Sequence, residues 1–163
     1  MLSSLQGMTF TMKSDFNFNS YTKPELLAPA GSFDCLKAAV QNGADAVYLG
    51  LKQGSARMAA DNFSLSELKE AVSYAHTREV RVYLAINTLM FDNELEFAYQ
   101  MAKEADSIGV DALILQDLGL AKKILKNKSS FNCEIHASTQ MSVYNSEGVK
   151  MLKKLGFDRC ITA

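Results

Sequence analysis

The chain has 163 residues, 48% of them hydrophobic, which is enough to build the core of a single domain. Its 17 basic and 18 acidic residues almost cancel, and this removes the strongest electrostatic argument for tight nucleic-acid binding. No apolar stretch approaches the roughly 20 residues that span a bilayer, so we expect no contact with a membrane.

The amino-terminal segment and the cysteines both favour a cytoplasmic protein. Residues 1–22 are rich in Ser, Asn, Thr and Phe without any period, and we interpret them as a leader that is loosely ordered or forms a small lid. Lys13 and Asp15 interrupt the apolar stretch that a signal peptide needs. The odd set of Cys35, Cys133 and Cys160 has no close spacing, which argues against a disulfide framework or a metal knuckle. Buried thiols in a reducing cytoplasm are the expectation.

From residue 23 onward, short apolar strands alternate with amphipathic helices. The first strand is predicted at residues 25–28, the run Pro29-Ala30-Gly31 breaks it, and Ser32 is placed to cap the first helix. The second strand is predicted at residues 46–49. The polar loop that follows, residues 52–57, is longer than a simple connection requires, and such loops often carry function in α/β proteins.

The middle of the chain has the clearest local signals. Ser64 and Glu67 form a capping box at the start of the second helix, and residues 80–87 are the most β-prone stretch. Asp92 is predicted to open the third helix. The residues of that helix expected to face inward are Leu95, Ala98, Met101, Ala102 and Ala105.

The last third of the chain continues the alternation. The fourth strand is predicted to end at Gln116 and Asp117, and Asp117 is placed to cap the fourth helix. The fifth strand is predicted at residues 132–137, and the fifth helix begins near Asn145. The residues that this last helix is expected to bury are Val149, Leu152 and Leu155. A sixth strand follows Gly156.

One short motif recurs three times, in residues 42–50, 108–115 and 155–162. Each copy ends a helical pattern with a Gly, and an apolar residue, an Asp and a β-rich run follow. Gly suits the left-handed position that ends a helix, and the short apolar run is typical of a strand buried on both faces of a parallel sheet. Because the first two copies start 66 residues apart, the interval has room for two βαβ units of roughly 30 residues.

Six strands and five helices in strict alternation fit two architectures. A complete β/α barrel needs eight strands and about 250 residues, whereas a doubly wound sheet of six strands would fit the length. Periodicity alone does not choose between them. Because the sequence stops inside an apolar strand with no helix to cover it, we expect an incomplete, truncated TIM-type β/α barrel over residues 23–163.

Polar residues gather at the predicted carboxyl ends of the strands, which is where both architectures bind ligands. The candidate site residues are Arg57, Asn87, Gln116, Asp117, His136, Ser138 and Gln140. Strand alternation puts His136 and Ser138 on one face, and Gln140 joins them if the strand continues. No metal-binding spacing, phosphate loop or paired-carboxylate motif is visible.

Each candidate has a structural alternative. His136 is the candidate general base but could be a core histidine with satisfied hydrogen bonds, and Asp117 could be a helix cap and not a catalytic acid. Arg57 could hold a carboxylate or phosphate or be an ordinary loop cation. Ser138 lacks an elbow motif, which makes it a weak nucleophile candidate. Asn87 and Gln116, like Gln140, are better suited to orient a ligand than to react.

Several long motifs resemble, in order, the N-terminal region of the collagenase-like peptidase family U-32. They lie between residues 24 and 163, at residues 25–32, 43–50, 62–64, 87–89, 111–117 and 136–140. The resemblance implies a β/α-barrel N-terminal domain. It also implies one of two activities, either proteolysis of collagen-like substrates or bacterial RNA-base hydroxylation with an iron–sulfur cluster and a prephenate-derived supply.

The resemblance places the cluster cysteines beyond the sixth strand, and Cys35, Cys133 and Cys160 do not replace them. We therefore expect no cofactor within this chain and an iron–sulfur cluster only in a longer protein. The resemblance carries over no agreed catalytic residue.

The leading hypothesis is the N-terminal part of a cytoplasmic bacterial peptidase of this family that binds a peptide or a small carboxylate-bearing ligand, with His136 as base. The alternative is an RNA-modifying protein whose barrel orients the substrate while a missing half holds the cluster. A further alternative is a non-catalytic assembly module. In each case the first and sixth strands would be open edges, and we expect a homo-oligomer that pairs through them.

Overall fold

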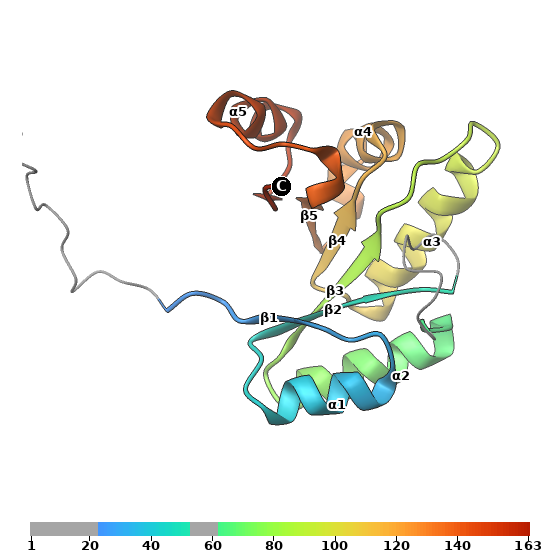
Figure 1. The fold of residues 1–163 in the computed structure, drawn as a ribbon. Helices are drawn as coiled ribbons and strands as arrows, with labels where there is room; N and C mark the ends of the chain where they lie inside the picture. Colours follow the sequence, from blue (N-terminus) through green and yellow to red (C-terminus); the bar gives the residue numbers. More distant parts are fainter. Residues whose placement is uncertain (1–22, 53–61) are drawn as a thin grey trace, which may run out of the picture.

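The computed structural model describes residues 23–52 and 62–163, so the predicted leader and Arg57 lie outside the described residues. Strands and helices alternate along the described chain (Figure 1). The elements are β1 (Leu27–Pro29), α1 (Phe33–Gln41), β2 (Ala46–Gly50), α2 (Leu65–His76), β3 (Arg81–Ile86), α3 (Leu95–Ile108), β4 (Ala112–Leu115), α4 (Leu118–Lys126), β5 (Glu134–Ala137), α5 (Ser146–Leu155) and β6 (Arg159–Cys160). Two short 3₁₀ helices, η2 (Lys128–Ser130) and η3 (Thr139–Met141), precede and follow β5.

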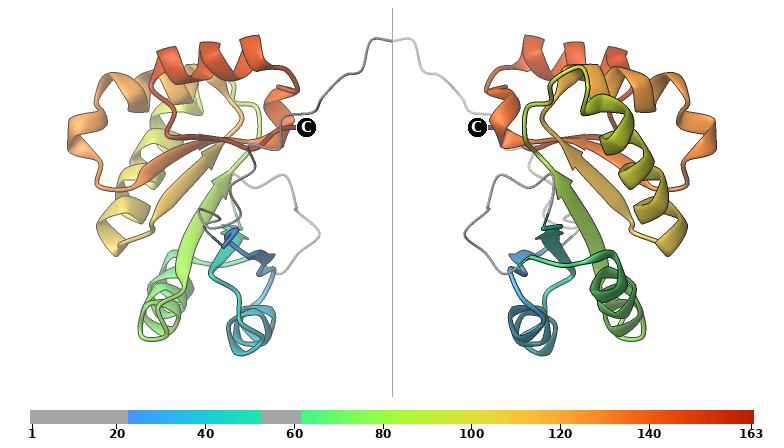
Figure 2. Two further views of the ribbon diagram at one scale, coloured as in Figure 1. Left: turned by 90° about the vertical axis from the view of Figure 1, so that its left-hand side faces the viewer. Right: turned by 90° about the vertical axis from the view of Figure 1, so that its right-hand side faces the viewer.

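The six described strands form one parallel sheet in the order β1-β2-β3-β4-β5-β6. Each strand pairs with the next one along the chain, so the order never reverses as it does in a doubly wound sheet. The sheet curls, and the five α-helices lie around its outer side (Figures 1 and 2). This is a half-barrel of the TIM type, and it confirms the predicted fold class.

The two faces of the curled sheet carry different side chains. Alternate strand residues such as Val82, Leu84 and Ile86 face the helices and join the larger hydrophobic cluster. The residues between them face the interior of the half-barrel. A smaller interior cluster contains Ala46, Tyr83, Ala85, Ala112 and Ile114. In a barrel of this type the interior is packed with side chains, and ligands bind at the carboxyl ends of the strands.

The aspartates of the recurring motif, Asp45, Asp111 and Asp158, join neighbouring strands. The backbone N–H of each donates to a carbonyl of the preceding strand region, and its carboxylate accepts the N–H of that same residue. The residues held in this way are Leu26 by Asp45, Val82 by Asp111 and Ile135 by Asp158. The motif is thus a two-point connection between the strands of a pair.

Each of these aspartates also has a basic partner. Their partners are Lys23 at 2.9 Å from Asp45, His76 at 2.9 Å from Asp111 and Lys128 at 2.7 Å from Asp158. The backbone hydrogen bond from Leu26 and the nearby Lys23 lower the pKa of Asp45. The glycines of the motif, Gly43, Gly109 and Gly156, have φ values of 85°, 102° and 104°, which confirms the predicted left-handed helix ends.

Local signals place most helix starts correctly. The side chains of Ser32, Ser64, Asp117 and Asn145 cap their helices, and Ser64 forms the capping box with Glu67. All four confirm the predicted N-termini.

Three expectations about the elements were wrong. Asp92 does not open the third helix: α3 begins at Leu95 behind Glu94, whose carboxylate accepts the N–H of Phe91 and so forms a turn before the helix. The first strand ends at Pro29 and not at residue 28, because an edge strand tolerates a proline, whose missing N–H is not needed there. In α5, Leu152 is buried as expected, but Val149 and Leu155 are 37% and 51% exposed.

Candidate functional site

Three predicted site residues occupy one level of the half-barrel. Ile86 pairs with Leu115, which pairs with Ala137, so the residues that follow, Asn87, Gln116 and Ser138, end three adjacent strands at the same height. The Ser138 N–H donates to the Leu115 carbonyl at 2.8 Å and continues this register. Because Ile86, Leu115 and Ala137 belong to the helix-facing cluster, the next residues fall on the interior side. We call Asn87, Gln116 and Ser138 the polar row.

The polar row is made of uncharged hydrogen-bonding groups. Ser138 is buried, whereas Asn87 and Gln116 are half-buried. The Ser138 hydroxyl oxygen accepts the N–H of Gln140 at 3.2 Å and so caps η3. This bond does not favour the Ser138 hydroxyl as a nucleophile, which would need a base beside it.

Gln140 lies outside the polar row. The prediction that it shares a face with His136 required the fifth strand to continue, but β5 ends at Ala137 and Gln140 is an exposed residue of η3. Its predicted role in substrate binding has no support from this arrangement.

His136 lies one layer below the polar row, in the interior of the half-barrel. It pairs in register with the interior residue Ile114, and its side chain is fully buried. Its Nε2 lies 2.7 Å from Oε2 of Glu134, two residues back along β5. The ring of Tyr83 meets the imidazole edge-on at a centroid distance of 5.1 Å. Burial lowers the pKa of His136, although the Glu134 carboxylate works in the opposite direction.

Below His136, at the amino ends of the strands, Glu25 joins the first strand region to the third and the sixth. Its carboxylate pairs with Arg81, accepts the Tyr83 hydroxyl at 2.8 Å and pairs with Arg159 at 2.6 Å. Burial raises the pKa of Tyr83, while the two guanidinium groups act in the opposite direction. The sequence patterns did not predict this cluster. The signal that could have found it is the alternation that puts Arg81 and Tyr83 on the same face as Ala85.

Asp117 is a helix cap. Its Oδ1 accepts the N–H of Leu120 at 2.8 Å, and its Oδ2 accepts the N–H of Met90 at 3.3 Å. The structure thus confirms the alternative interpretation of Asp117. A role as catalytic acid remains a prediction, and both carboxylate oxygens are engaged in backbone contacts.

Comparison with known proteins identifies the family: a sequence model of Peptidase family U32 matches residues 31–163. The chain belongs to Peptidase family U32. It is 41% identical over 130 residues to the "Uncharacterized protease MJ0090" of Methanocaldococcus jannaschii, covering 80% of this chain and 31% of that protein. In the solved structure of the U32 peptidase Mk0906, 60% of that chain matches 88% of this one, with a TM-score of 0.71 and 15% identity. That likeness concerns the fold alone.

Other U32 relatives are named for RNA chemistry. The "23S rRNA 5-hydroxycytidine C2501 synthase" of Escherichia coli is 37% identical over 85% of this chain and 20% of its own length. The "tRNA hydroxylation protein P1" of Bacillus subtilis is 34% identical over 86% of this chain and 33% of its own length. The chain thus spans a third or less of these curated U32 relatives.

The cysteines of this U32 chain do not fit an iron–sulfur cluster, which needs several thiolates around the iron atoms. Cys133 is buried, and burial together with the neighbouring Asp106 raises the pKa of its thiol to about 12. Cys35 is exposed on α1 and Cys160 is half-buried on β6. Within residues 23–52 and 62–163, no group of three His, Cys, Asp or Glu side chains is placed to hold a metal ion.

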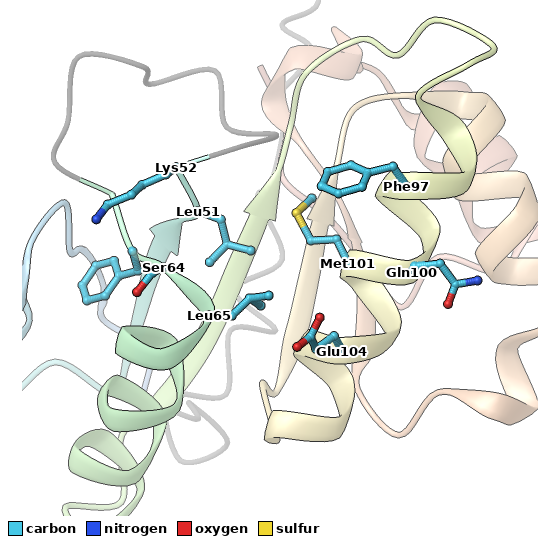
Figure 3. Close-up of a pocket in the computed structure, with 9 residues that line it drawn as sticks. Leu51, Lys52, Ser64, Leu65, Phe97, Gln100, Met101 and Glu104 are labelled. Atoms are coloured by element: carbon cyan, nitrogen blue, oxygen red, sulfur yellow. The ribbon is translucent and has the colours of Figure 1, made fainter.

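The outer surface has a separate apolar groove of about 310 Å³ between α2 and α3 (Figure 3). Leu51, Leu65, Phe97 and Met101 line it, with Gln100 and Glu104 at its α3 side. The groove lies on the helical layer and not over the polar row, so we do not assign it to the candidate site. In the part of the chain that the structure describes, no helix is both long and apolar enough to cross a membrane.

Proposed function

We propose that this chain is the barrel segment of a cytoplasmic RNA-base hydroxylation protein, and that the polar row orients the base. The observation that carries the proposal is the row itself, uncharged amide and hydroxyl groups on three adjacent strand ends. Amide side chains both donate and accept hydrogen bonds, which matches the edges of a nucleobase removed from its stack. Two of the relatives described above carry RNA hydroxylation in their names.

The charge of the chain limits what this segment would contribute. Its formal net charge is −1, so it offers little of the electrostatic attraction that holds phosphate backbones. In this proposal the segment positions the base, and the RNA backbone is held elsewhere in a longer protein. The oxidising cofactor would also be held outside this chain.

The test uses the gene product that contains this chain, expressed in E. coli that lacks both its own 23S rRNA 5-hydroxycytidine synthase and its own tRNA hydroxylation protein P. Hydroxylated nucleosides in rRNA and tRNA are measured by mass spectrometry. We expect the product to appear, and the variants Asn87→Ala and Gln116→Ala to reduce its yield roughly two- to tenfold each, since each loses a hydrogen bond to the base. The control is Gln100→Ala, which removes an amide side chain from the outer side of α3. An RNA composition identical to that of the deletion strain would refute the proposal.

A second candidate function is peptide-bond hydrolysis, which the name of the archaeal relative favours. In that case His136 would activate a water molecule as general base. The complete burial of its side chain, which limits access for a peptide, makes this the weaker candidate. The same gene product is assayed on gelatin and on labelled peptides beside its His136→Ala form. Equal rates would remove His136 from any catalytic role.

A further inference from the structure

One nitrogen in the interior of the half-barrel has no partner. Within the described residues, Nδ1 of His136 is the single buried side-chain nitrogen or oxygen without a hydrogen bond. Buried polar groups are nearly always paired, and an exception calls for a physical reason such as a bound water or ligand. The imidazole is fully buried and lies on the interior face, beside Ile114 and nearly perpendicular to the ring of Tyr83.

The other ring nitrogen decides what Nδ1 can do. Nε2 lies 2.7 Å from Oε2 of Glu134, and a carboxylate only accepts hydrogen bonds, so Nε2 carries the hydrogen. The charges that face the ring are those of Glu134, Arg159 and Asp158. Burial lowers the pKa of His136 and favours the neutral ring. A neutral imidazole with its hydrogen on Nε2 leaves a lone pair on Nδ1.

The alternative protonation states are less compatible with this geometry. A hydrogen on Nδ1 alone would set the Nε2 lone pair against the carboxylate. An imidazolium would place a positive charge on a fully buried ring, which burial disfavours. Glu134 is suited to select the neutral ring with its hydrogen on Nε2. It begins β5 on the same interior face as His136, and its side chain is half exposed.

We propose that Glu134 is a positioning residue that holds His136 as its Nε2–H tautomer and makes Nδ1 a preset hydrogen-bond acceptor inside the half-barrel. The chemistry that this site takes is an N–H or O–H donor, supplied by an ordered water or by a small neutral polar ligand. The inference goes beyond the proposed function, since neither Glu134 nor His136 belongs to the polar row.

The test is nitrogen NMR of the imidazole in the ¹⁵N-labelled chain at pH 7. We expect His136 to show a protonated Nε2 and an unprotonated Nδ1. Glu134→Gln keeps an acceptor oxygen and should keep this tautomer, whereas Glu134→Leu should produce a mixture. Glu104→Leu, which removes an exposed carboxylate on α3, is the matched control. Circular dichroism checks that each variant is folded.

Two outcomes overturn the role of Glu134. One is an Nδ1–H tautomer or an imidazolium in the unmodified chain, and the other is an unchanged tautomer in folded Glu134→Leu. Two further measurements then identify the donor. Magnetisation transfer from solvent to the His136 ring would indicate an ordered water, and a shift of Nδ1 on adding cytidine would indicate an organic ligand. The absence of both would overturn the acceptor site.

Discussion

At the scale of single residues, Asp117 has two structural duties. It caps α4 through Leu120, and it holds the β3–α3 loop through the Met90 N–H. We predict that Asp117→Ala lowers the free energy of unfolding by about 1–2 kcal/mol, the usual effect of losing such a cap. Asp117→Asn should change it by only a few tenths of a kcal/mol, because Asn is an equally good cap. Urea unfolding measures both.

The same pair of variants separates the two interpretations of Asp117. An amide cannot act as a general acid. If Asp117 is only a cap, the hydroxylation yield of the Asp117→Asn gene product should equal that of the unmodified one. Full stability with lost activity would instead make Asp117 a catalytic residue.

His136 should make stability depend on pH. Burial lowers its folded-state pKa below the ordinary value of 6.5, so the unfolded chain binds the proton more readily. The stabilisation is therefore complete above about pH 6.5 and is lost as the pH falls toward the folded-state pKa. We predict a loss of up to about 1.4 kcal/mol per pH unit from this group.

This pH dependence is measured by urea unfolding between pH 7.5 and 5.0, with His136→Gln as the comparison. The two curves should run parallel above pH 7 and diverge below pH 6.5. Glu134, Arg159 and Asp158 face this position in both proteins, so the difference between the curves reports His136 itself. Parallel curves over the whole range would mean that His136 is readily protonated in the folded protein.

At the scale of elements, the recurring motif works as a connection between strands, and Asp111 is its central copy. Its carboxylate accepts the Val82 N–H at 2.7 Å and the His76 side chain lies at 2.9 Å. We predict that Asp111→Ala lowers the free energy of unfolding by about 1–3 kcal/mol, because the β3 amide is left without its acceptor. Asp92→Ala should stay within about 0.5 kcal/mol, since Asp92 is exposed and caps no helix. Comparable losses in the two variants, measured by urea unfolding, would contradict the assigned role.

How far the sequence predicts these elements depends on whether a signal is local. The caps at Ser64 and Asp117 and the glycine at 109 could be predicted, because their hydrogen bonds and backbone angles lie within a few residues. The start of α3 could not, because Glu94 reaches back to the Phe91 N–H and competes with Asp92. Which side chains of α5 are buried depends on the elements that pack against each side of the helix, and the sequence of α5 alone does not show which elements these are.

The same distinction holds for the candidate site. Strand alternation and the common register of β3, β4 and β5 place Asn87, Gln116 and Ser138 at one level, whereas His136, which was expected at the same rim, lies one layer below. The contact of His136 with Glu134 is also local, because the two residues are two apart on β5. It was not predicted, because His136 was expected at the carboxyl ends of the strands. Glu25 and Arg159 are 134 residues apart, and only the curvature of the sheet brings them together.

At the scale of the whole molecule, Glu25 connects the two ends of the sheet through its interior. It precedes β1, whereas Arg159 begins β6, the other edge strand. Arg81 and the Tyr83 hydroxyl, both from β3, bind the same carboxylate. One carboxylate therefore joins the region before β1 to β3 and β6 at the amino end of the half-barrel, below the level of the polar row.

The two edge strands and α5 leave apolar surface that another copy could cover. In the described structure β1 and β6 each have a neighbour on one side only, and Met151 and Leu155 of α5 are 52% and 51% exposed. Burying such side chains contributes roughly 25 cal/mol per Å². We therefore predict that the chain, 17.9 kDa as a monomer, forms a dimer or larger assembly at micromolar concentration.

Light scattering with size-exclusion chromatography measures the mass. Leu155→Glu should shift it toward 17.9 kDa, because a charge in the contact must be stripped of water without a partner. Leu89→Glu is the matched control: Leu89 is 72% exposed but lies in the β3–α3 loop, away from both sheet edges. A sharp monomer mass for the unmodified chain would rule out the assembly, and an equal shift in both variants would place the contact outside α5.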